Sequence, residues 1–330
     1  MRTYREKDID SFALAGREIA IIGYGNQARA QAANIRDSGV RVLIALRQGS
    51  ESVKIATRDG FRVATIEEAV GKAHIISMLV PDEYHSEVWE KFLKGRVRSG
   101  AMIVFASTVA VHFENIRFSD DVDVVLVGPM GPGDALRSEY KAGRGLPAKI
   151  AVLQDSTGKA LSLCLAYAGA LGSARTGLLE TTFKIEAELD LFSEQVVLCG
   201  GLPALVISAY ELLVKEGYPA EQAYIETVFE TRAIADLMSK YGVDGMRKRI
   251  STTALYGGKI AGDKLIDDRV RQSMQSILDN IRSGSFYEEF RKGRPVKRDE
   301  LERVPQSMLS SKSEVEKLFM SDKEKMFGKH

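Results

Sequence analysis

The chain has few cysteines and histidines, the residues that bind soft metals or form disulfides. Its 330 residues include only two cysteines and four histidines, which argues against a zinc site of the His/Cys type. Cys164 and Cys199 both lie in apolar sequence with helical character. We therefore expect two buried thiols in a reducing cytoplasm, and no disulfide framework.

An excess of one charge and a long apolar run are also missing. The formal net charge is +1, and charged residues make up 28% of the chain. Composition therefore predicts no electrostatic attraction to nucleic acid or to a membrane surface. No apolar run approaches the roughly 20 residues that span a bilayer. The start, MRTYREKDID, lacks the apolar core of a secretory signal. These features favour a cytoplasmic protein with no nucleic-acid and no membrane partner.

The first half of the chain alternates apolar strands with helices. Each predicted strand is a continuous β-branched run, the pattern of strands that crossover helices bury on both faces. These runs are residues 18–23, 40–46, 74–80, 101–107, 122–128 and 149–154. The connection rules then favour a right-handed, doubly wound parallel sheet. The predicted fold class is α/β followed by all-α.

From Thr182 onward the sequence is helical in character. Predicted helices cover residues 184–198, 203–216, 219–241, 263–283 and 311–320, and no convincing strand interrupts them. Gly217 ends one helix and Pro219 starts the next, the usual asymmetry of helix ends. We therefore predict two domains, an α/β domain at residues 1–181 and an all-α domain at residues 182–327.

A glycine turn follows the first predicted strand. Gly23-Tyr24-Gly25-Asn26-Gln27-Ala28 joins that strand to a helix, which leads into a second strand. This is the context that a dinucleotide-binding motif requires. Backbone amides at such a helix start bind a pyrophosphate, helped by the helix dipole. An ordinary strand-to-helix turn is the alternative interpretation.

The end of the second strand bears on the type of dinucleotide. NAD sites usually carry a carboxylate there for the ribose hydroxyls, whereas this chain has Arg47, Ser50 and Ser52. A guanidinium and two hydroxyls suit a 2′-phosphate, which favours NADPH. Glu51 keeps NAD open, and a solvated loop arginine is the alternative for Arg47. Residues 80–85 follow the third strand, where doubly wound sheets bind their ligands.

Two pairs of carboxylates lie one helical turn apart in the second half. Asp190 and Glu194 form one pair, and Glu226 and Glu230 form the other; residues at this spacing share a helix face. Apolar residues flank both pairs, Glu186 extends the first row, and neither row has a lysine at the compensating position. Half-buried acids so placed must protonate or find a cation. Oxygen ligands from two facing helices favour Mg²⁺, and four carboxylates balance two such ions. Solvated helix faces are the alternative.

At these residues the chain resembles ketol-acid reductoisomerase, the NADPH- and Mg²⁺-dependent family of branched-chain amino-acid biosynthesis. The similarity covers nearly the whole chain and favours the short form of the family. The segments that carry it are GYGNQ, NIRDSG, LRQGSES, PDE, GPG, ETTFK, DLFSEQVVLCGG, EQAYIE and ADLM. The resemblance implies a Rossmann-like domain followed by a knotted helical domain. It also implies a homodimer, or a higher oligomer of dimers, in which helices from both subunits build each active site.

The resemblance further implies roles for individual residues. The four carboxylates match the Mg²⁺ ligands: Asp190 would bridge two ions, and Glu230 would be the catalytic carboxylate that also engages substrate. Ser251 matches a serine that contacts substrate. The cofactor contacts match at Tyr24, Gly25, Asn26, Gln27, Arg47, Ser50, Ser52, Asp82, Glu83, Tyr84, His85 and Gly133.

The implied reaction has two steps and acts on a small 2-hydroxy-2-alkyl-3-keto acid such as 2-acetolactate. Mg²⁺ polarises the substrate oxygens while the alkyl group migrates to the neighbouring carbon. NADPH then delivers a hydride to the new ketone, which gives a 2,3-dihydroxy acid.

The chain departs from the family pattern on the substrate side. Ser107 stands where the family has a functional histidine, Met130 where it has a lysine, Asp134 where a histidine is typical and Leu255 where a glutamate is usual. These changes remove proton-handling and charged groups, whereas the cofactor contacts and metal ligands are retained. Three interpretations stay open: a reductoisomerase that tolerates the losses, a diverged enzyme that reduces a different 2-keto acid without migration, and a non-catalytic NADP-binding dimer.

Overall fold

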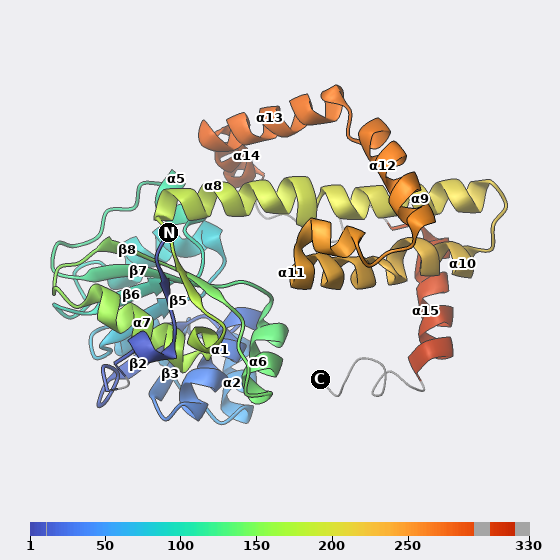
Figure 1. The fold of residues 1–330 in the computed structure, drawn as a ribbon. Helices are drawn as coiled ribbons and strands as arrows, with labels where there is room; N and C mark the ends of the chain where they lie inside the picture. Colours follow the sequence, from blue (N-terminus) through green and yellow to red (C-terminus); the bar gives the residue numbers. More distant parts are fainter. Residues whose placement is uncertain (11, 294–303, 321–330) are drawn as a thin grey trace. The chain divides into compact units, whose positions relative to one another are not determined.

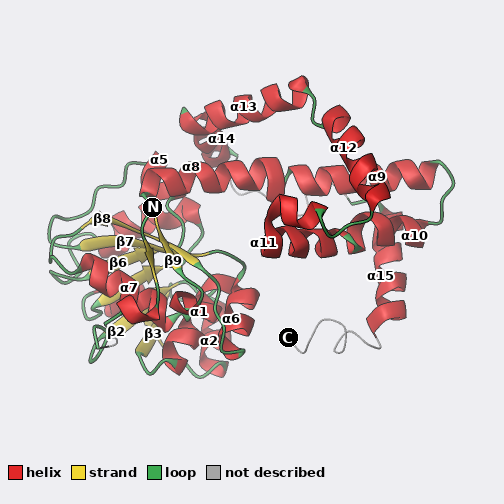
Figure 2. Cartoon of the chain, viewed as in Figure 1, coloured by secondary structure: helices red, strands yellow, loops and turns green. Residues whose placement is uncertain are grey.

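The computed structural model describes residues 1–10, 12–293 and 304–320. The chain divides into two compact units, with the division between Leu189 and Asp190. The first unit is a sheet with helices on both faces, and the second is helical (Figures 1 and 2). The predicted domain boundary between residues 181 and 182 stays a prediction.

One sheet of nine strands organises the first unit. The strands lie in the order β1-β9-β8-β7-β6-β5-β2-β3-β4. Their bounds are β1 Thr3–Tyr4, β2 Glu18–Ile22, β3 Arg41–Leu46, β4 Arg62–Thr65, β5 Ile75–Met78, β6 Met102–Phe105, β7 Asp123–Pro129, β8 Ala148–Gln154 and β9 Leu178–Glu180. From β4 across to β7 every neighbouring pair is parallel. The predicted Rossmann-like α/β fold is confirmed.

The sheet is mixed at its other edge, where β8 runs antiparallel to β7 and β1 antiparallel to β9. After β7, helix α6 (Gly133–Lys141) packs along α1 (Asn26–Asp37). Residues 142–147 then bring the chain back to the end of β7, where the Met130 N–H donates to the Pro147 carbonyl oxygen at 2.8 Å. Because β8 starts at the end where β7 stops, it runs in the opposite direction. The prediction of a wholly parallel sheet was wrong at this edge.

Strands β1, β4 and β9 were not predicted from the sequence. Each has between two and four residues, too few to show a period or a β-branched run. Thr3 pairs with Leu179, a partner far away in the sequence. For β1, pairing with a distant segment therefore makes these residues a strand, rather than their own composition.

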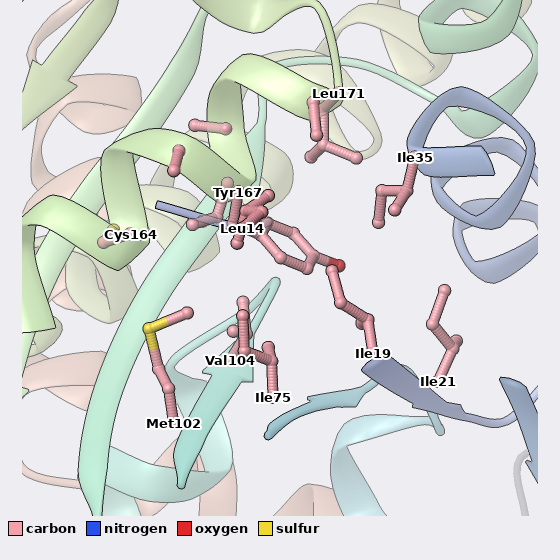
Figure 3. Close-up of a cluster of buried hydrophobic side chains, with 14 of the residues drawn as sticks. Leu14, Ile19, Ile21, Ile35, Ile75, Met102, Val104, Cys164, Tyr167 and Leu171 are labelled. Atoms are coloured by element: carbon pink, nitrogen blue, oxygen red, sulfur yellow. The ribbon is translucent and has the colours of Figure 1, made fainter. Parts of the chain in front are cut away.

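Helices cover both faces of this sheet. They are α1, α2 (Ser52–Arg58), α3 (Ile66–Val70), α4 (His85–Val88), α5 (Val109–Phe113), α6 and α7 (Ala160–Ala170), together with a π-helical segment at Trp89–Leu93 and 3-10 turns at Glu6–Asp8, Asp82–Tyr84 and Ser173–Arg175. Tyr167 of α7 is buried on one face among the side chains of Figure 3. Its hydroxyl bonds to Gln31 Oε1 at 2.8 Å and to Ser77 Oγ at 2.9 Å, so a buried polar group is satisfied without water.

The described part of the second unit is helical and contains no strand. Its elements begin within α8 (Phe183–Ser193), which starts in the first unit, and continue as a π-helical segment Glu194–Leu198, α9 (Gly201–Lys215), α10 (Ala220–Tyr224), a π-helical segment Ile225–Phe229, α11 (Thr231–Arg247), α12 (Thr252–Leu265), α13 (Asp268–Arg282), α14 (Ser285–Lys292) and α15 (Gln306–Met320). Tyr210, Ala223 and Met308 form a small core where α10 packs against α9 and α15. The helix predicted at 263–283 is interrupted, because Asp267 is the N-cap of α13 and its side chain accepts from the Val270 N–H at 2.9 Å.

Two expectations drawn from composition were wrong. Cys164 is buried, but Cys199, at the end of the π-helical segment Glu194–Leu198, is exposed. The helical run Phe183–Lys215 is long and apolar enough to cross a membrane, judged by length and composition alone. A single helix of this kind is weak support for a membrane span, but the expectation that no apolar run approaches that length does not hold.

Candidate active site

A glycine turn joins β2 to α1 at the carboxyl edge of the sheet. Gly23 has a φ of +98°, and a Cβ added there would lie 2.6 Å from the Leu79 carbonyl oxygen. Only glycine therefore allows this turn to lie so close to the end of β5. Gly25 is the N-cap of α1 and offers no side-chain cap, so the first N–H groups of the helix stay available to an anion.

A second glycine lies directly behind this turn. Gly133 begins α6, and a Cβ added there would lie 2.3 Å from the Asn26 carbonyl oxygen. Gln27 reinforces the contact, because its Nε2 donates to the Gly131 carbonyl oxygen at 2.8 Å. The start of α6 and the start of α1 are thus fastened together by backbone contact, which places Gly133 beside the predicted pyrophosphate site.

A cavity of about 460 Å³ opens beside the glycine turn, a volume typical of cofactor and small-molecule sites. It lies where parallel strands end, at the position at which such sheets bind ligands. The structure brings together there the turn, the loop from β3 to α2 and the segment after β5. The predicted cofactor contacts that line it are Tyr24, Gly25, Asn26, Gln27, Arg47, Ser50, Ser52 and Tyr84.

The apolar walls of this cavity were missed by sequence reasoning. Leu46 and Leu79 at strand ends, Ile66 of α3, and Val88 and Phe92 after β5 line the space between the polar contacts. Such walls accept the flat face of a ring. The sequence offers no signal that separates these residues from ordinary core, because only packing decides which apolar side chains face a cavity.

Tyr24 is a wall residue and not an acid–base group. The side chain is buried, its ring lies edge-on to Phe61 with centroids 5.9 Å apart, and its hydroxyl donates to Asp59 Oδ2 at 3.0 Å. Burial, reinforced by the Asp59 carboxylate, raises the pKa of Tyr24 well above its ordinary value. The phenol therefore stays protonated and holds the ring in place.

A smaller cavity of about 230 Å³ lies at the ends of β5 and β6. Its lining includes Gln27, Asp82 and His85, which were predicted as cofactor contacts, and also Ser107. Ser107 Oγ donates to Asp82 Oδ2 at 3.1 Å. Glu83 lies on the same short turn as Asp82 and is half-buried. In a doubly wound sheet this end of the crevice lies beyond the pyrophosphate, on the side away from the Arg47 loop.

His85 is held as a neutral ring. Its side chain is 2% exposed, Nε2 donates to the Val80 carbonyl oxygen at 3.0 Å, and the ring packs on Phe105. Burial lowers the pKa of His85 to about 4, although the Val80 carbonyl and nearby carboxylates oppose the shift. With Nε2 donating, Nδ1 is the lone-pair nitrogen, and it lies 3.6 Å from Asp82 Oδ1. His85 can therefore shape the cavity but does not carry a proton at neutral pH.

Three of the four predicted metal ligands lie in or directly after π-helical segments, and the fourth, Asp190, lies in an α-helix. Asp190 is in α8 and Glu194 begins the first segment, while Glu226 lies within the second and Glu230 ends it, with its N–H donating to the Ile225 carbonyl oxygen at 3.1 Å. Helices with such segments are frequent at functional sites. Asp190 is half-buried, but Glu194, Glu226 and Glu230 are exposed, so the expectation of half-buried acids was wrong for these three in one chain.

These carboxylates are not gathered within one chain. Among the residues that the structure describes, no group of three or more His, Cys, Asp or Glu side chains could hold a metal ion. Ser251, the predicted substrate contact, is exposed at the start of α12 and caps that helix by accepting from the Ala254 N–H at 3.1 Å. The roles of these residues stay predictions.

Comparison with known proteins decides the family. A model of the acetohydroxy acid isomeroreductase NADPH-binding domain matches residues 13–177, and one of the ketol-acid reductoisomerase C-terminal domain matches residues 183–319. The chain belongs to the ketol-acid reductoisomerase family. It is 44% identical to the ketol-acid reductoisomerase (NADP(+)) of Pyrobaculum calidifontis over 307 residues, which are 92% of this chain and 94% of that protein.

Solved structures agree with this assignment. An NADH-preferring ketol-acid reductoisomerase from an uncultured archaeon is 35% identical, with a TM-score of 0.91 over 97% of this chain and 99% of that one. A semialdehyde dehydrogenase NAD-binding protein from Cupriavidus necator is 18% identical, with a TM-score of 0.63 over 81% of this chain and 99% of that one. At that identity the second match concerns the fold alone.

The positions that depart from the reductoisomerase pattern lie at accessible places. Met130 is 46% exposed just after β7, and Leu255 is 41% exposed on α12. Asp134 is the second residue of α6 and is exposed. Ser107 lines the smaller cavity. The altered side chains near the sheet can therefore be reached from solvent or from a bound ligand.

Glu186, which extends the acidic row on α8, is buried and has partners outside its own helix. Its side chain is 4% exposed, and Oε2 accepts from the Thr108 N–H at 3.1 Å and also from the Thr108 hydroxyl. Lys149 Nζ lies 3.6 Å from Glu186 Oε1. The compensating cation comes from β8 and not from the helix itself, which is why helical spacing did not reveal it.

Proposed function

We propose that the chain converts 2-acetolactate-type acids into 2,3-dihydroxy acids, with NADPH as hydride donor and two Mg²⁺ ions. The observation that carries the proposal is the cavity at the glycine turn, lined by the family's matching cofactor positions, in a chain that both family domains match. Of the interpretations left open by the sequence, this one uses every retained residue.

The chain's own residues suit a phosphorylated dinucleotide. The uncapped N–H groups that follow Gly25 would bind the pyrophosphate. Arg47, Ser50 and Ser52 line the same cavity and would hold the 2′-phosphate, the guanidinium by charge-assisted hydrogen bonds. Asp82 and Ser107 are bonded to each other at the opposite end, where the nicotinamide and the substrate ketone would meet.

The donor set suits Mg²⁺, provided that two chains contribute to each site. Asp190 with Glu194, and Glu226 with Glu230, each present two carboxylates one turn apart, and oxygen ligands are those that Mg²⁺ prefers. When bound, the ions would supply Lewis acidity for the migration and would orient the substrate. Glu230 would also hold the substrate, and Ser251 would contact it.

A second copy of the chain is the proposed partner of the helical unit. Val197, Leu198, Leu202, Leu205 and Leu212 are each between 40% and 58% exposed along one helical run. An exposed apolar surface of this kind marks an interaction site. A homodimer would cover this run, and its second chain would supply the missing carboxylate pair. A knotted helical domain and a cytoplasmic location stay predictions.

The test is turnover of 2-acetolactate by the purified protein with Mg²⁺, followed through the absorbance of NADPH. We expect oxidation of NADPH in step with formation of the dihydroxy acid, and loss of both when EDTA replaces Mg²⁺. Light scattering during size-exclusion chromatography measures the oligomer in the same preparation. No turnover by a dimeric, NADPH-binding sample would refute the proposed reaction.

A second candidate is reduction of a 2-keto acid without migration. The substitutions at Ser107 and Met130 favour it, because they remove a histidine and a lysine while leaving the cofactor contacts in place. Supplying the already migrated ketone, 3-hydroxy-3-methyl-2-ketobutyrate, separates the two. Reduction of this ketone without turnover of 2-acetolactate would support the second candidate. Each assay is also run with NADH, and the rates with NADPH and NADH are compared. This measures the cofactor preference, since one relative is described as NADH-preferring.

A further inference from the structure

A buried carboxylate lies directly behind the turn that carries Ser107. Glu186 of α8 is 4% exposed, and its Oε2 accepts from both the N–H and the hydroxyl of Thr108. The Phe183 carbonyl oxygen lies 2.8 Å from the same Thr108 hydroxyl, whose single hydrogen is shared between the two acceptors. An ionised carboxylate this deeply buried requires a positive partner as well as hydrogen bonds.

Lys149 is a positive partner of this carboxylate, with its Nζ 3.6 Å from Glu186 Oε1. The Lys149 side chain is 24% exposed, so its stem is largely covered and its charge lies at the edge of the buried cluster. The pair joins β8 to α8 across the end of the sheet, within the first unit.

The position of Lys149 in the sheet relates it to Met130. Lys149 pairs with Gly128 of β7, and the pairing continues as the Met130 N–H donates to the Pro147 carbonyl oxygen at 2.8 Å. Met130 is thus the diagonal neighbour of Lys149, on the face that cross-strand partners share. Long side chains at these two positions therefore lie side by side on the same face of the sheet. At the position of Met130 the family has a lysine.

The turn held by Glu186 also faces the candidate site. Ser107 precedes Thr108, and its Oγ donates to Asp82 Oδ2 at 3.1 Å in the smaller cavity. A shift of Thr108 would therefore move Ser107 and Asp82 together. A chain of contacts runs from Lys149 through Glu186 and Thr108 to the wall of the cavity.

We propose that Lys149 is a positioning residue that supplies, from the neighbouring strand, the positive charge absent at Met130. It acts through Glu186, which holds the Ser107–Thr108 turn against the cavity. This inference rests on the proposed function and explains how a site with methionine in place of the family lysine keeps its charge balance and its shape.

The experiment moves the charge from one strand to the other. Lys149→Met alone should lower kcat for 2-acetolactate by about 10- to 100-fold, the scale of a misplacement near 1 Å, with the Kd for NADPH unchanged within error. The double variant Lys149→Met/Met130→Lys should recover most of the lost kcat and of the lost thermal midpoint. Lys72→Met, an exposed lysine elsewhere in the first unit, is the matched control and should change neither.

The outcomes separate the inference from the proposed function. If wild type turns over 2-acetolactate and Lys149→Met does so equally well, the positioning role is overturned. If the double variant recovers the thermal midpoint but not kcat, the Lys149–Glu186 ion pair is only a structural contact. That result would also overturn the positioning role. If wild type is inactive on 2-acetolactate and on its migrated ketone, the proposed function fails. The ligand-free thermal midpoints then still decide whether Met130→Lys replaces the charge of Lys149.

Discussion

Replacing Gly133 with alanine tests whether α6 supports the nucleotide turn. The added Cβ would lie 2.3 Å from the Asn26 carbonyl oxygen and 2.6 Å from the carbonyl carbon. Both partners are backbone atoms, so no side chain can rotate away. To reach an ordinary contact distance of 3.4 Å, the start of α6 and the glycine turn must separate by about 1 Å.

Two effects follow from this separation, and they differ in size. Overpacking of this kind costs about 1–3 kcal/mol, which lowers the thermal midpoint by roughly 2–4 °C for each kcal/mol in a domain of this size. Displacing the Asn26 and Gln27 amides by about 1 Å also degrades their aim at the pyrophosphate. We expect the Kd for NADPH to rise about 10- to 100-fold, or about 1.4–2.8 kcal/mol.

Fluorescence titration with NADPH and a thermal melt of Gly133→Ala measure both quantities. Gly71→Ala is the control, because its φ is −72° and its Cβ would lie at an ordinary contact distance of 3.6 Å from the Arg96 carbonyl oxygen. Wild-type affinity and melting in Gly133→Ala would refute the reasoning, since the backbone contact would then support neither the fold nor the site.

Further predictions concern charge. Arg47→Ala should weaken NADPH binding by roughly 1.5–3 kcal/mol and NADH binding far less; equal losses in titration would contradict a 2′-phosphate contact. Because burial lowers the folded-state pKa of His85 to about 4 from an ordinary 6.5, the unfolded chain binds the proton first as pH falls. This group should leave stability unchanged above pH 6.5 and reduce it as pH falls from 6.5 towards 4, and His85→Gln should flatten urea midpoints across that window. Glu226→Gln should weaken Mg²⁺ binding in calorimetry while NADPH affinity stays at the wild-type value, whereas an unchanged Mg²⁺ affinity would remove Glu226 from the ligand set.

Local chemistry made much of the cofactor site predictable. The turn from Gly23 to Gln27 could be recognised because a strand, two glycines and a helix start are all consecutive in sequence. Arg47, Ser50 and Ser52 follow a strand end, so their place at the cavity follows from the sheet alone. Where partners are distant, prediction failed. The direction of β8 depends on where residues 142–147 return the chain, and no local pattern encodes that return.

Burial of individual side chains was the other point of failure. Cys164 and Cys199 occupy similar apolar sequence, yet one is buried and the other exposed. His85 reads as a polar residue in a ligand-binding loop, but packing on Phe105 makes it a neutral part of the wall. An apolar side chain or sequence favours burial, whereas the neighbours of a residue in the folded structure decide whether it is buried.

The sequence by itself determined the strand–turn–helix that would hold a dinucleotide, the helical character of the second half, and the family, because each depends on residues adjacent along the chain or on a long run of matching segments. Only the tertiary structure decided that Lys149 neutralises Glu186 and that Gly133 lies against Asn26. The physical reason is distance along the chain: hydrogen bonds and ion pairs act over a few ångströms, and the fold alone brings such residues within that range.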